Sequence, residues 1–529
     1  MRREKSSAKQ LLVLHKQLCF RRAFPASVEA HGDAVRQLAA FDKQVAKLPK
    51  TGRQELLDSG IGGTVLYYRF SLPVAAWLSR KAPGAVSIDW AAVENVQQVD
   101  DLLRCIIEPS EDEFFDSGYV NCREWLDLAR SSENVTDFDW LLTQIRKRPA
   151  TSNAHYLYEA ADLPLAVNLG RCSLSKSQNT LRVKKVHTRE RGMRPCPPNV
   201  KKEIQRPFRS LPKVSRGRGK ALLDAAMASL AVRHRETNHF NHANPDEVYE
   251  FDVGDGVSVV VFGLRPEYRY PIECTMGFLI LSNGVPIGYG GTSALFRQAN
   301  TGINIFDEFR GSEAAFLWVQ VMRVKHFMTG CSRFIANPYQ FGGDNSEALR
   351  SGAFWFYYGL GFRPVLAETR ALARREVRKK TKDARYRSNL KTLRSLTVCD
   401  MHLTLPGARK SELFEEEWLV AMSKLATAVL ANTGKKSRRD AVDVVARDLA
   451  RDLRLRGYGH WTALERRAFR TMAPIVAAAT PASWSVSAKR EMRQLLRAKG
   501  GIGEANYARQ LAEHDDFRIA LTRACRGVD

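Results

Sequence analysis

Residues 277–291 read GFLILSNGVPIGYGG. Two apolar segments lie on either side of Asn283-Gly284, a dipeptide that favours type I′ turns, so this stretch predicts a β-hairpin. The chain continues over residues 301–330 as TGINIFDEFRGSEAAFLWVQVMRVKHFMTG. Its β-branched and aromatic residues predict a strand up to Phe309, and the apolar residues that follow predict a buried helix that ends at Gly330.

A further strand is expected over residues 333–337, directly after the buried helix. Strand, helix and strand in this order indicate a right-handed crossover between two parallel strands. The first N–H groups of such a helix have no intrahelical partner and lie at the positive end of its dipole. Residues 310–315 are therefore a candidate site for a phosphate group. A glycine there, Gly311, lets a phosphate approach the backbone closely.

This segment resembles the one with which the GNAT superfamily of N-acetyltransferases holds the pyrophosphate of coenzyme A, on the pattern Arg/Gln-x-x-Gly-x-Gly/Ala. Arg310, Gly311 and Ala315 fit the pattern. Glu313 replaces its central glycine, and it would bring a carboxylate close to the diphosphate unless Arg310 or Lys325 compensates the charge. The resemblance covers about a third of the chain.

A second match to the family lies in residues 353–362, AFWFYYGLGF, which look like the GNAT ending Ala-x-x-x-Tyr-x-x-x-Gly-Phe. In the family this tyrosine often protonates the departing thiolate. The resemblance therefore implies Tyr357 as the general acid, with Tyr358 as the alternative. Arg350 occupies a position where the family usually has asparagine, although Asn345 lies just upstream.

The resemblance implies direct attack of an amine on the thioester of acetyl-CoA, another acyl-CoA or an acyl-carrier protein, with a backbone N–H of the strand stabilising the oxyanion. An alkylamine has a pKa near ~10, so a base or a water chain must remove its proton at neutral pH. Asp307 and Glu308 are the candidate bases, and Glu273 is a further one. The residues expected to contact the donor are Ile305, Phe306, Arg310, Gly311, Ser312, Ala314, Ala315 and Asn345.

No metal is expected, because His234, His239 and His242 match no established zinc spacing. The nine cysteines show no C-x-x-C spacing, which favours a reducing cytoplasm without a disulfide framework. No run reaches the ~18 uninterrupted apolar residues of a membrane span, and the N-terminus shows no classical signal peptide. We therefore expect a cytoplasmic protein without a membrane span.

The sequence predicts an α/β protein in four parts. A mainly helical domain is expected over residues 1–180, and a basic linker rich in proline and glycine over residues 181–219. Residues 220–406 should form a GNAT-like domain, with a central mixed and twisted sheet and flanking helices. Helical spacing returns over residues 407–529, which predicts a helical C-terminal domain.

The net charge of +25 is concentrated in two stretches, residues 182–220 and residues 370–394. Such localised positive charge attracts nucleic acid, anionic lipid or an acidic protein. The first stretch equally fits a solvated linker, because of its prolines and glycines. The second contains an expected helix over 371–380, inserted between strands near 362–365 and 397–405, where a plain GNAT fold has a hairpin connection.

Three functions remain open on the sequence alone. The first is transfer of an acyl group from a thioester to an amine. The second is aminoacyl transfer from tRNA, as in the Fem peptide ligases, whose GNAT-like halves hold tRNA on basic surfaces. It requires a second such half, which residues 1–180 do not visibly supply. The third is a non-catalytic protein that binds nucleic acid on a degenerate acyltransferase fold, with Gly311 and Tyr357 purely structural.

Overall fold

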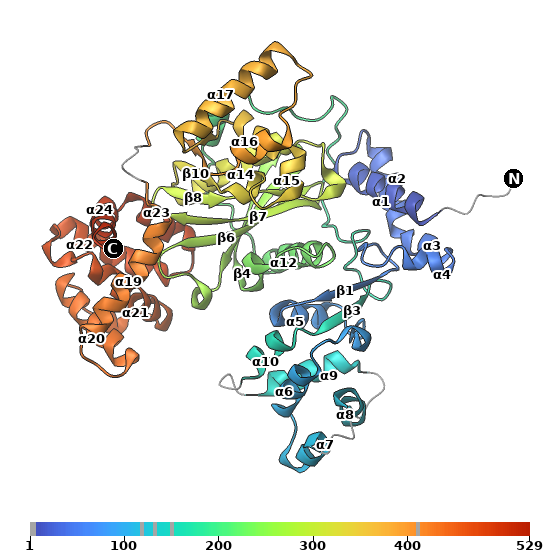
Figure 1. Cartoon of the computed structure of the whole chain (residues 1–529), viewed down its shortest axis with the longest axis horizontal. Coiled ribbons are helices and arrows are strands. Elements are labelled where there is room, and N and C mark those ends of the chain that lie inside the picture. Colours follow the sequence, from blue (N-terminus) through green and yellow to red (C-terminus); the bar gives the residue numbers. More distant parts are fainter. Residues whose placement is uncertain (1–6, 117–120, 131–134, 149–152, 409–412, 529) are drawn as a thin grey trace.

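The computed structural model describes residues 7–116, 121–130, 135–148, 153–408 and 413–528. A large mixed sheet with many helices around it forms the centre of the chain, so the expected α/β class is confirmed (Figure 1). The C-terminal helices lie at one end of this sheet, and the N-terminal part lies at the other end and below it. Within the described residues, every helix is too short or too polar to cross a lipid bilayer.

The N-terminal part combines helices with a small sheet that the sequence did not predict. Three strands, β1 (Val65–Arg69), β2 (Val86–Ile88) and β3 (Pro164–Asn168), form an antiparallel sheet in the order β1-β3-β2. The helices of this part are α1 (Ala8–Ala23), α2 (Val28–Ala39), α3 (Phe41–Ala46), α4 (Lys50–Gln54), α5 (Leu72–Lys81), α6 (Val96–Arg104), α7 (Asp112–Asp116), α8 (Cys122–Ala129), α9 (Asp137–Lys147) and α10 (Ala154–Ala161).

The central sheet contains nine strands in the order β11-β12-β10-β8-β7-β6-β5-β4, with β9 paired to β7. Their bounds are β4 (Ala243–Gly254), β5 (Val257–Leu264), β6 (Cys274–Ser282), β7 (Val285–Leu295), β8 (Gln298–Thr301), β9 (Asn304–Ile305), β10 (Arg333–Ala336), β11 (Arg363–Pro364) and β12 (Met401–Thr404). The pairs are antiparallel apart from β8 and β10, which are parallel. The sheet is therefore mixed, as expected.

The β6–β7 hairpin forms where the sequence predicted it. Asn283 and Gly284, which connect the two strands, have φ of 47° and 75°. A type I′ turn requires positive φ at both positions, which Asn and Gly adopt at low cost. The side chain of Asn283 fixes the turn further, because its Nδ2 donates to the carbonyls of Ala23 at 3.0 Å and His187 at 2.9 Å.

The predicted crossover is also present, since β8 and β10 are parallel and α14 (Ala314–Thr329) connects them. The predicted strand over residues 301–309 is wrong in its extent. β8 begins earlier, at Gln298, β9 covers only 2 residues, and Asp307–Phe309 form a 3-10 turn, η4. The ladder starts early because a tight turn at Phe296, with a φ of 52°, follows β7 directly.

The stretch 181–219 is not the free linker that the sequence suggested. It contains a short helix, α11 (Val200–Ile204), and it lies along the central domain up to the start of α12 (Arg216–Ala231). Arg323 of α14, for example, donates to the carbonyl of Arg206 at 2.7 Å. Proline and glycine mark an irregular backbone, but they do not show whether that backbone is solvated or packed.

The predicted inserted helix is confirmed as α17 (Ala367–Lys382). Together with α18 (Leu390–Leu396) it connects β11 to β12, and it projects from the top of the molecule in Figure 1. The remaining helices of the centre are α13 (Asn238–Asn241), α15 (Ser346–Ser351) and α16 (Ala353–Gly359). The C-terminal helices are α19 (Glu417–Ala431), α20 (Arg438–Asp452), α21 (Ala463–Ala478), α22 (Val486–Lys499), α23 (Glu504–Glu513) and α24 (Asp515–Arg526).

Candidate active site

The turn before α14 is open to solvent. Gly311 is exposed and has a φ of +83°, a backbone conformation that side chains other than glycine rarely adopt. Among the described residues, no heavy atom beyond its chain neighbours lies within 4 Å of the position that a Cβ of Gly311 would take. The backbone at Gly311 can therefore be approached closely from outside.

The amides behind this turn are those of a helix start. The first hydrogen bond of α14 runs from Leu317 N to Glu313 O, at 2.9 Å. The N–H groups of Ala314, Ala315 and Phe316 precede it and have no intrahelical partner. Because α14 has 16 residues, the positive end of its dipole lies at the same place. The two predicted donor contacts Ala314 and Ala315 thus belong to the helix start that the sequence indicated.

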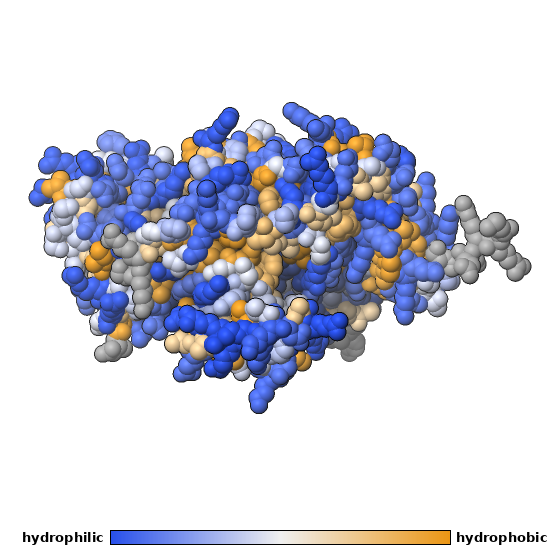
Figure 2. Space-filling view, turned by 90° about the horizontal axis from the view of Figure 1, so that it is seen from above, coloured by the Kyte–Doolittle hydropathy of each residue, from blue (hydrophilic) through white to orange (hydrophobic). Residues whose placement is uncertain are grey.

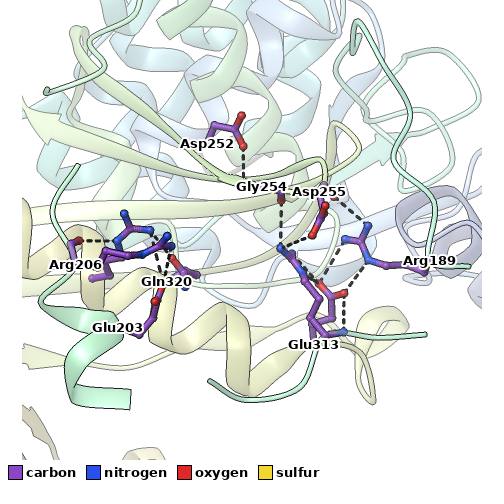
Figure 3. Close-up of polar contacts among 10 residues, drawn as sticks. Arg189, Glu203, Arg206, Asp252, Gly254, Asp255, Glu313 and Gln320 are labelled. Carbon is purple, nitrogen blue, oxygen red and sulfur yellow. Dashed lines mark hydrogen bonds and ion pairs between the residues drawn. The ribbon is translucent and has the colours of Figure 1, made fainter. Parts of the chain in front are cut away.

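Glu313 carries a buried carboxylate held by two arginines of the stretch 181–219. The Nε of Arg189 donates to Glu313 Oε1 at 2.7 Å, and the two side chains point toward each other in Figure 3. Arg194 donates from its backbone N at 3.0 Å and from its guanidinium at 2.9 Å. We call these three residues the Glu313 clamp.

The clamp determines the charge beside the open turn. Burial raises the pKa of Glu313, but the hydrogen bonds and charges of Arg194 and Arg189 outweigh burial and bring its pKa below the ordinary value. Two guanidinium groups thus face one carboxylate. The guanidinium of Arg194 also lies over the ring of Phe316, in the first turn of α14, with its central carbon 3.8 Å from the ring centre.

Neither residue expected to compensate Glu313 does so. Arg310 is half exposed and pairs with Asp307 at 2.9 Å and with Glu347 at 2.5 Å. Lys325 is buried, where it donates to Thr301 Oγ1 and to a backbone carbonyl, and burial lowers its pKa well below the ordinary value. The sequence pointed to the wrong cations because the true partners lie more than 100 positions earlier in the chain.

Of the two main candidate bases, Glu308 does not suit the task. Its carboxylate is buried, 3.1 Å from Lys176 Nζ and 3.4 Å from Arg233 Nε. Burial raises its pKa, but Arg233 and Lys176 prevail and lower it to about 2. A carboxylate of such low basicity is a poor proton acceptor at neutral pH. Asp307, by contrast, is half exposed in its pair with Arg310.

Tyr357 lies on α16 and is buried among aromatic rings. Its ring contacts those of Phe341 and Phe362, with centroids 6.0 Å and 5.3 Å away, and that of Trp318 in α14. Burial raises its pKa, and a backbone interaction with Ile303 acts in the opposite direction. The phenol therefore keeps its proton at neutral pH, as a general acid must before it acts.

β8 and β10 part next to this tyrosine. They pair as far as Asn300 and Ile335, after which the chain leaves the ladder at Gly302 and β9 pairs with β7 instead. The side chain of Gln340, in the 3-10 turn Pro338–Phe341, fills the space beside the break. A Cβ on Gly302 would lie 2.1 Å from its Oε1.

Two residues expected to contact the donor, Phe306 and Asn345, make contacts that support the fold. The backbone N of Phe306 donates to Ile287 O at 3.0 Å, and its buried ring stacks against Tyr289. The side chain of Asn345 caps α15, because its Oδ1 accepts from Ala348 N at 3.0 Å.

The other two expected contacts lie at or near the break and the turn. Ile305 pairs with Gly288 in the β7–β9 ladder. The hydroxyl of Ser312 is buried and has no hydrogen-bond partner among the described residues. Of the predicted donor residues, Arg310, Gly311, Ser312, Ala314 and Ala315 therefore gather around the open turn.

Sequence reasoning missed three residues of this site, Arg189, Arg194 and Gln340. The arginines lie in an irregular stretch, and no local pattern records a partner so far along the chain. Gln340 lies in a short turn of ordinary composition. Among the described residues, no group of three His, Cys, Asp or Glu side chains could hold a metal ion.

Comparisons of the chain with protein-family models, with curated proteins and with solved structures gave no match. The case for any function therefore depends on the residues and the geometry described above.

Proposed function

We propose that the protein is an N-acyltransferase that takes an acyl group from a phosphopantetheine thioester, in acetyl-CoA, another acyl-CoA or an acyl-carrier protein, and passes it to an amine. The observation that carries the proposal is the solvent-open turn at Gly311, at the start of a helix whose first amides have no intrahelical partner. The likeness of residues 310–315 and 353–362 to GNAT motifs supports it.

The phosphate end of the donor would lie on the open turn. Unpaired amides and the helix dipole favour an anion there, and Gly311 leaves room for it. Glu313 does not oppose this, because Arg189 and Arg194 pair with its carboxylate, and Arg194 also pairs with the exposed Asp255 at 3.4 Å, so the charges of this group balance. Arg310, half exposed on the same turn, would exchange its carboxylate partners for a phosphate oxygen.

The thioester end would reach the break between β8 and β10. The backbone amide of Gly302 lies outside the β8–β10 ladder, so it can donate to the oxygen of the tetrahedral intermediate, whereas the neighbouring backbone of Ile303 already interacts with the Tyr357 phenol. The side chain of Gln340 occupies this space and has to turn away before the thioester enters. Tyr357, which interacts with the backbone of Ile303, is then the proposed proton donor at the break.

The reaction would proceed by direct transfer. The amine nitrogen attacks the thioester carbonyl carbon, the C–S bond breaks, and the departing sulfur takes the proton of Tyr357. The nitrogen loses its own proton to a chain of water molecules, and Asp307 accepts the proton at the end of that water chain. Glu308 is too weak a base for this role.

Isothermal titration with acetyl-CoA tests the proposal, with Gly311→Asp as the variant. At about 5 Å and an effective dielectric of about 20, the added carboxylate repels one negative charge of the diphosphate by about 3 kcal/mol. The affinity for acetyl-CoA should therefore fall by about 100-fold. Gly434→Asp is the matched control, because Gly434 is equally open and has a similar φ of +67°. Equal affinity in both variants, or no binding by the unchanged protein, would refute the proposal.

Aminoacyl transfer from tRNA remains a second candidate, favoured by the exposed basic helix α17. Against it, the described part of residues 1–180 forms a three-stranded antiparallel sheet with helices and contains no second large mixed sheet. Acyl transfer to an amine from acetyl-CoA in nuclease-treated protein would exclude the tRNA-dependent reaction. Binding of nucleic acid without any binding of acetyl-CoA would support the non-catalytic alternative.

A further inference from the structure

The two basic stretches of the sequence differ in how their charges are used. In residues 182–220, Arg189 and Arg194 bind the buried Glu313, and Arg206 pairs with Glu203 at 2.7 Å. These three cations are therefore paired with carboxylates of the same chain. The second stretch, residues 370–394, forms α17 and the chain after it, which project from the molecule (Figure 1).

The acidic residue in the middle of α17 does not screen its outer face. Glu376 is turned inward and buried, where its carboxylate accepts from Lys379 Nζ at 2.8 Å, from the hydroxyl of Tyr386 at 2.9 Å and from that of Ser388 at 2.7 Å. Thr369 and Ala373 are buried on the same side. The other side of the helix faces solvent.

That outer face carries a row of exposed cations: Arg374, Arg375, Arg378 and Lys382. We call this row the α17 basic face. Among the described residues, no carboxylate pairs with any of the four. Arg374, Arg378 and Lys382 follow one another at intervals of four, so like charges lie on adjacent turns, an arrangement that destabilises a helix by itself. With a rise of 1.5 Å per residue, the row is about 12 Å long.

Aromatic side chains lie on the inward side of α17, where Lys380 follows the buried Glu376 by four residues, and in the neighbouring α16. The Nζ of Lys380 is 4.0 Å from the ring centre of Trp355 in α16, and the guanidinium of Arg363 lies 4.0 Å over the ring of Tyr358. Both rings are half buried. Seen from above, the side from which α17 projects is mostly hydrophilic, with apolar residues among the polar ones near its middle (Figure 2).

We propose that the α17 basic face binds the phosphate backbone of a nucleic acid. A row of three guanidinium groups and one ammonium group, with no carboxylate among them, matches a polyphosphate chain, and binding would relieve the repulsion between the four charges. The contacts are to phosphates, so the binding is independent of base sequence and weakens steeply with salt. This inference does not depend on the acyl-transfer proposal, because the two surfaces share no residue.

Fluorescence anisotropy with a labelled mixed-sequence RNA hairpin, and with a DNA duplex, over a series of salt concentrations tests the proposal. The variant is Arg374→Gln, Arg375→Gln, Arg378→Gln and Lys382→Gln together. Glutamine keeps the helix propensity of arginine and lysine, so the fold should persist, as circular dichroism can check. The slope of log affinity against log salt should become shallower by about 3 to 4.

A second fourfold variant with the same charge change serves as the control: Lys435→Gln, Lys436→Gln, Arg439→Gln and Arg447→Gln, at exposed positions of the C-terminal part. Its slope should match that of the unchanged protein. An unchanged slope in the α17 variant would overturn the proposal. An equal decrease of the slope in the control would also overturn it, because net charge alone would then explain the binding.

The competing partner is an anionic lipid surface, tested with phosphatidylserine vesicles. If the α17 variant loses vesicle binding and keeps nucleic-acid binding, the proposal is wrong. Failure of the acyl-transfer proposal is recognised separately, because Gly311→Asp changes acetyl-CoA binding and should leave the salt slope for nucleic acid unchanged.

Discussion

Replacing Glu313 by glutamine removes the charge of the Glu313 clamp and nearly preserves its shape. Arg189 and Glu313 are almost fully buried, with side-chain exposures of 4% and 0%. At 2.7–2.9 Å and an effective dielectric of about 20, each contact amounts to about 6 kcal/mol before desolvation is subtracted. Removing one partner of a buried ion pair typically costs about 3–5 kcal/mol, and we expect Glu313→Gln to fall in that range.

Chemical denaturation, monitored by hydrogen exchange of the peptides of α14, measures the free energy of unfolding that Glu313→Gln loses at this helix. Asp448→Asn is the control, because Asp448 pairs with Arg451 at 2.6 Å while more than half of each side chain is exposed. Such a pair contributes about 1 kcal/mol or less. If both variants cost the same, the clamp does not stabilise the start of α14 and the reasoning about its charge is refuted.

The pH dependence gives a second check on the same variant. The folded pKa of Glu313 is below its ordinary value, so the stabilisation is fully present above the unfolded pKa of about 4.3 and disappears as the pH falls through the folded value. The unchanged protein and Glu313→Gln should therefore differ by the full amount at neutral pH and converge in acid. If the difference in free energy of unfolding between the two proteins stays constant from neutral pH into acid, Glu313 does not stabilise the fold through its charge.

Two further predictions concern the chemistry. Tyr357→Phe should slow acyl transfer by at least about ten-fold, with Tyr358→Phe as the control, and a steady-state rate assay decides between the two tyrosines as acid. Asp307→Asn should lower the rate and shift its pH profile, whereas Glu308→Gln should mainly destabilise. Since the pKa of Glu308 is about 2, its stabilisation should be present above about pH 4.3 and lost toward pH 2, as acid unfolding can show.

The parts of the fold that the sequence predicted depend on short-range patterns. The hairpin follows from Asn283-Gly284, where two adjacent residues tolerate positive φ, and the crossover follows from an apolar run long enough for a buried helix. The strand boundary near residue 301 was wrong, because the turn at Phe296 places an aromatic residue in a left-handed conformation that composition does not reveal.

The candidate site likewise contains features that the sequence predicted and others that it did not. The open turn at Gly311 was predictable, because a glycine before an apolar helix has a local signature. The pairing of Glu313 with Arg189 and Arg194 was not, since it joins residues more than 100 positions apart. The surroundings of Glu308 were not predictable either, because its proximity in sequence to the strand end does not indicate that Lys176 and Arg233 surround it.

The Glu313 clamp has a consequence for how the chain can be shortened or diverge. Arg189 is itself anchored to the N-terminal part, because its backbone N donates to Pro25 O at 2.7 Å. A fragment that begins at residue 220 would leave Glu313 with neither guanidinium, so it would have to bury a bare negative charge or unravel the first turn of α14. Homologous chains that change residue 313 should accordingly change residues 189 and 194 with it.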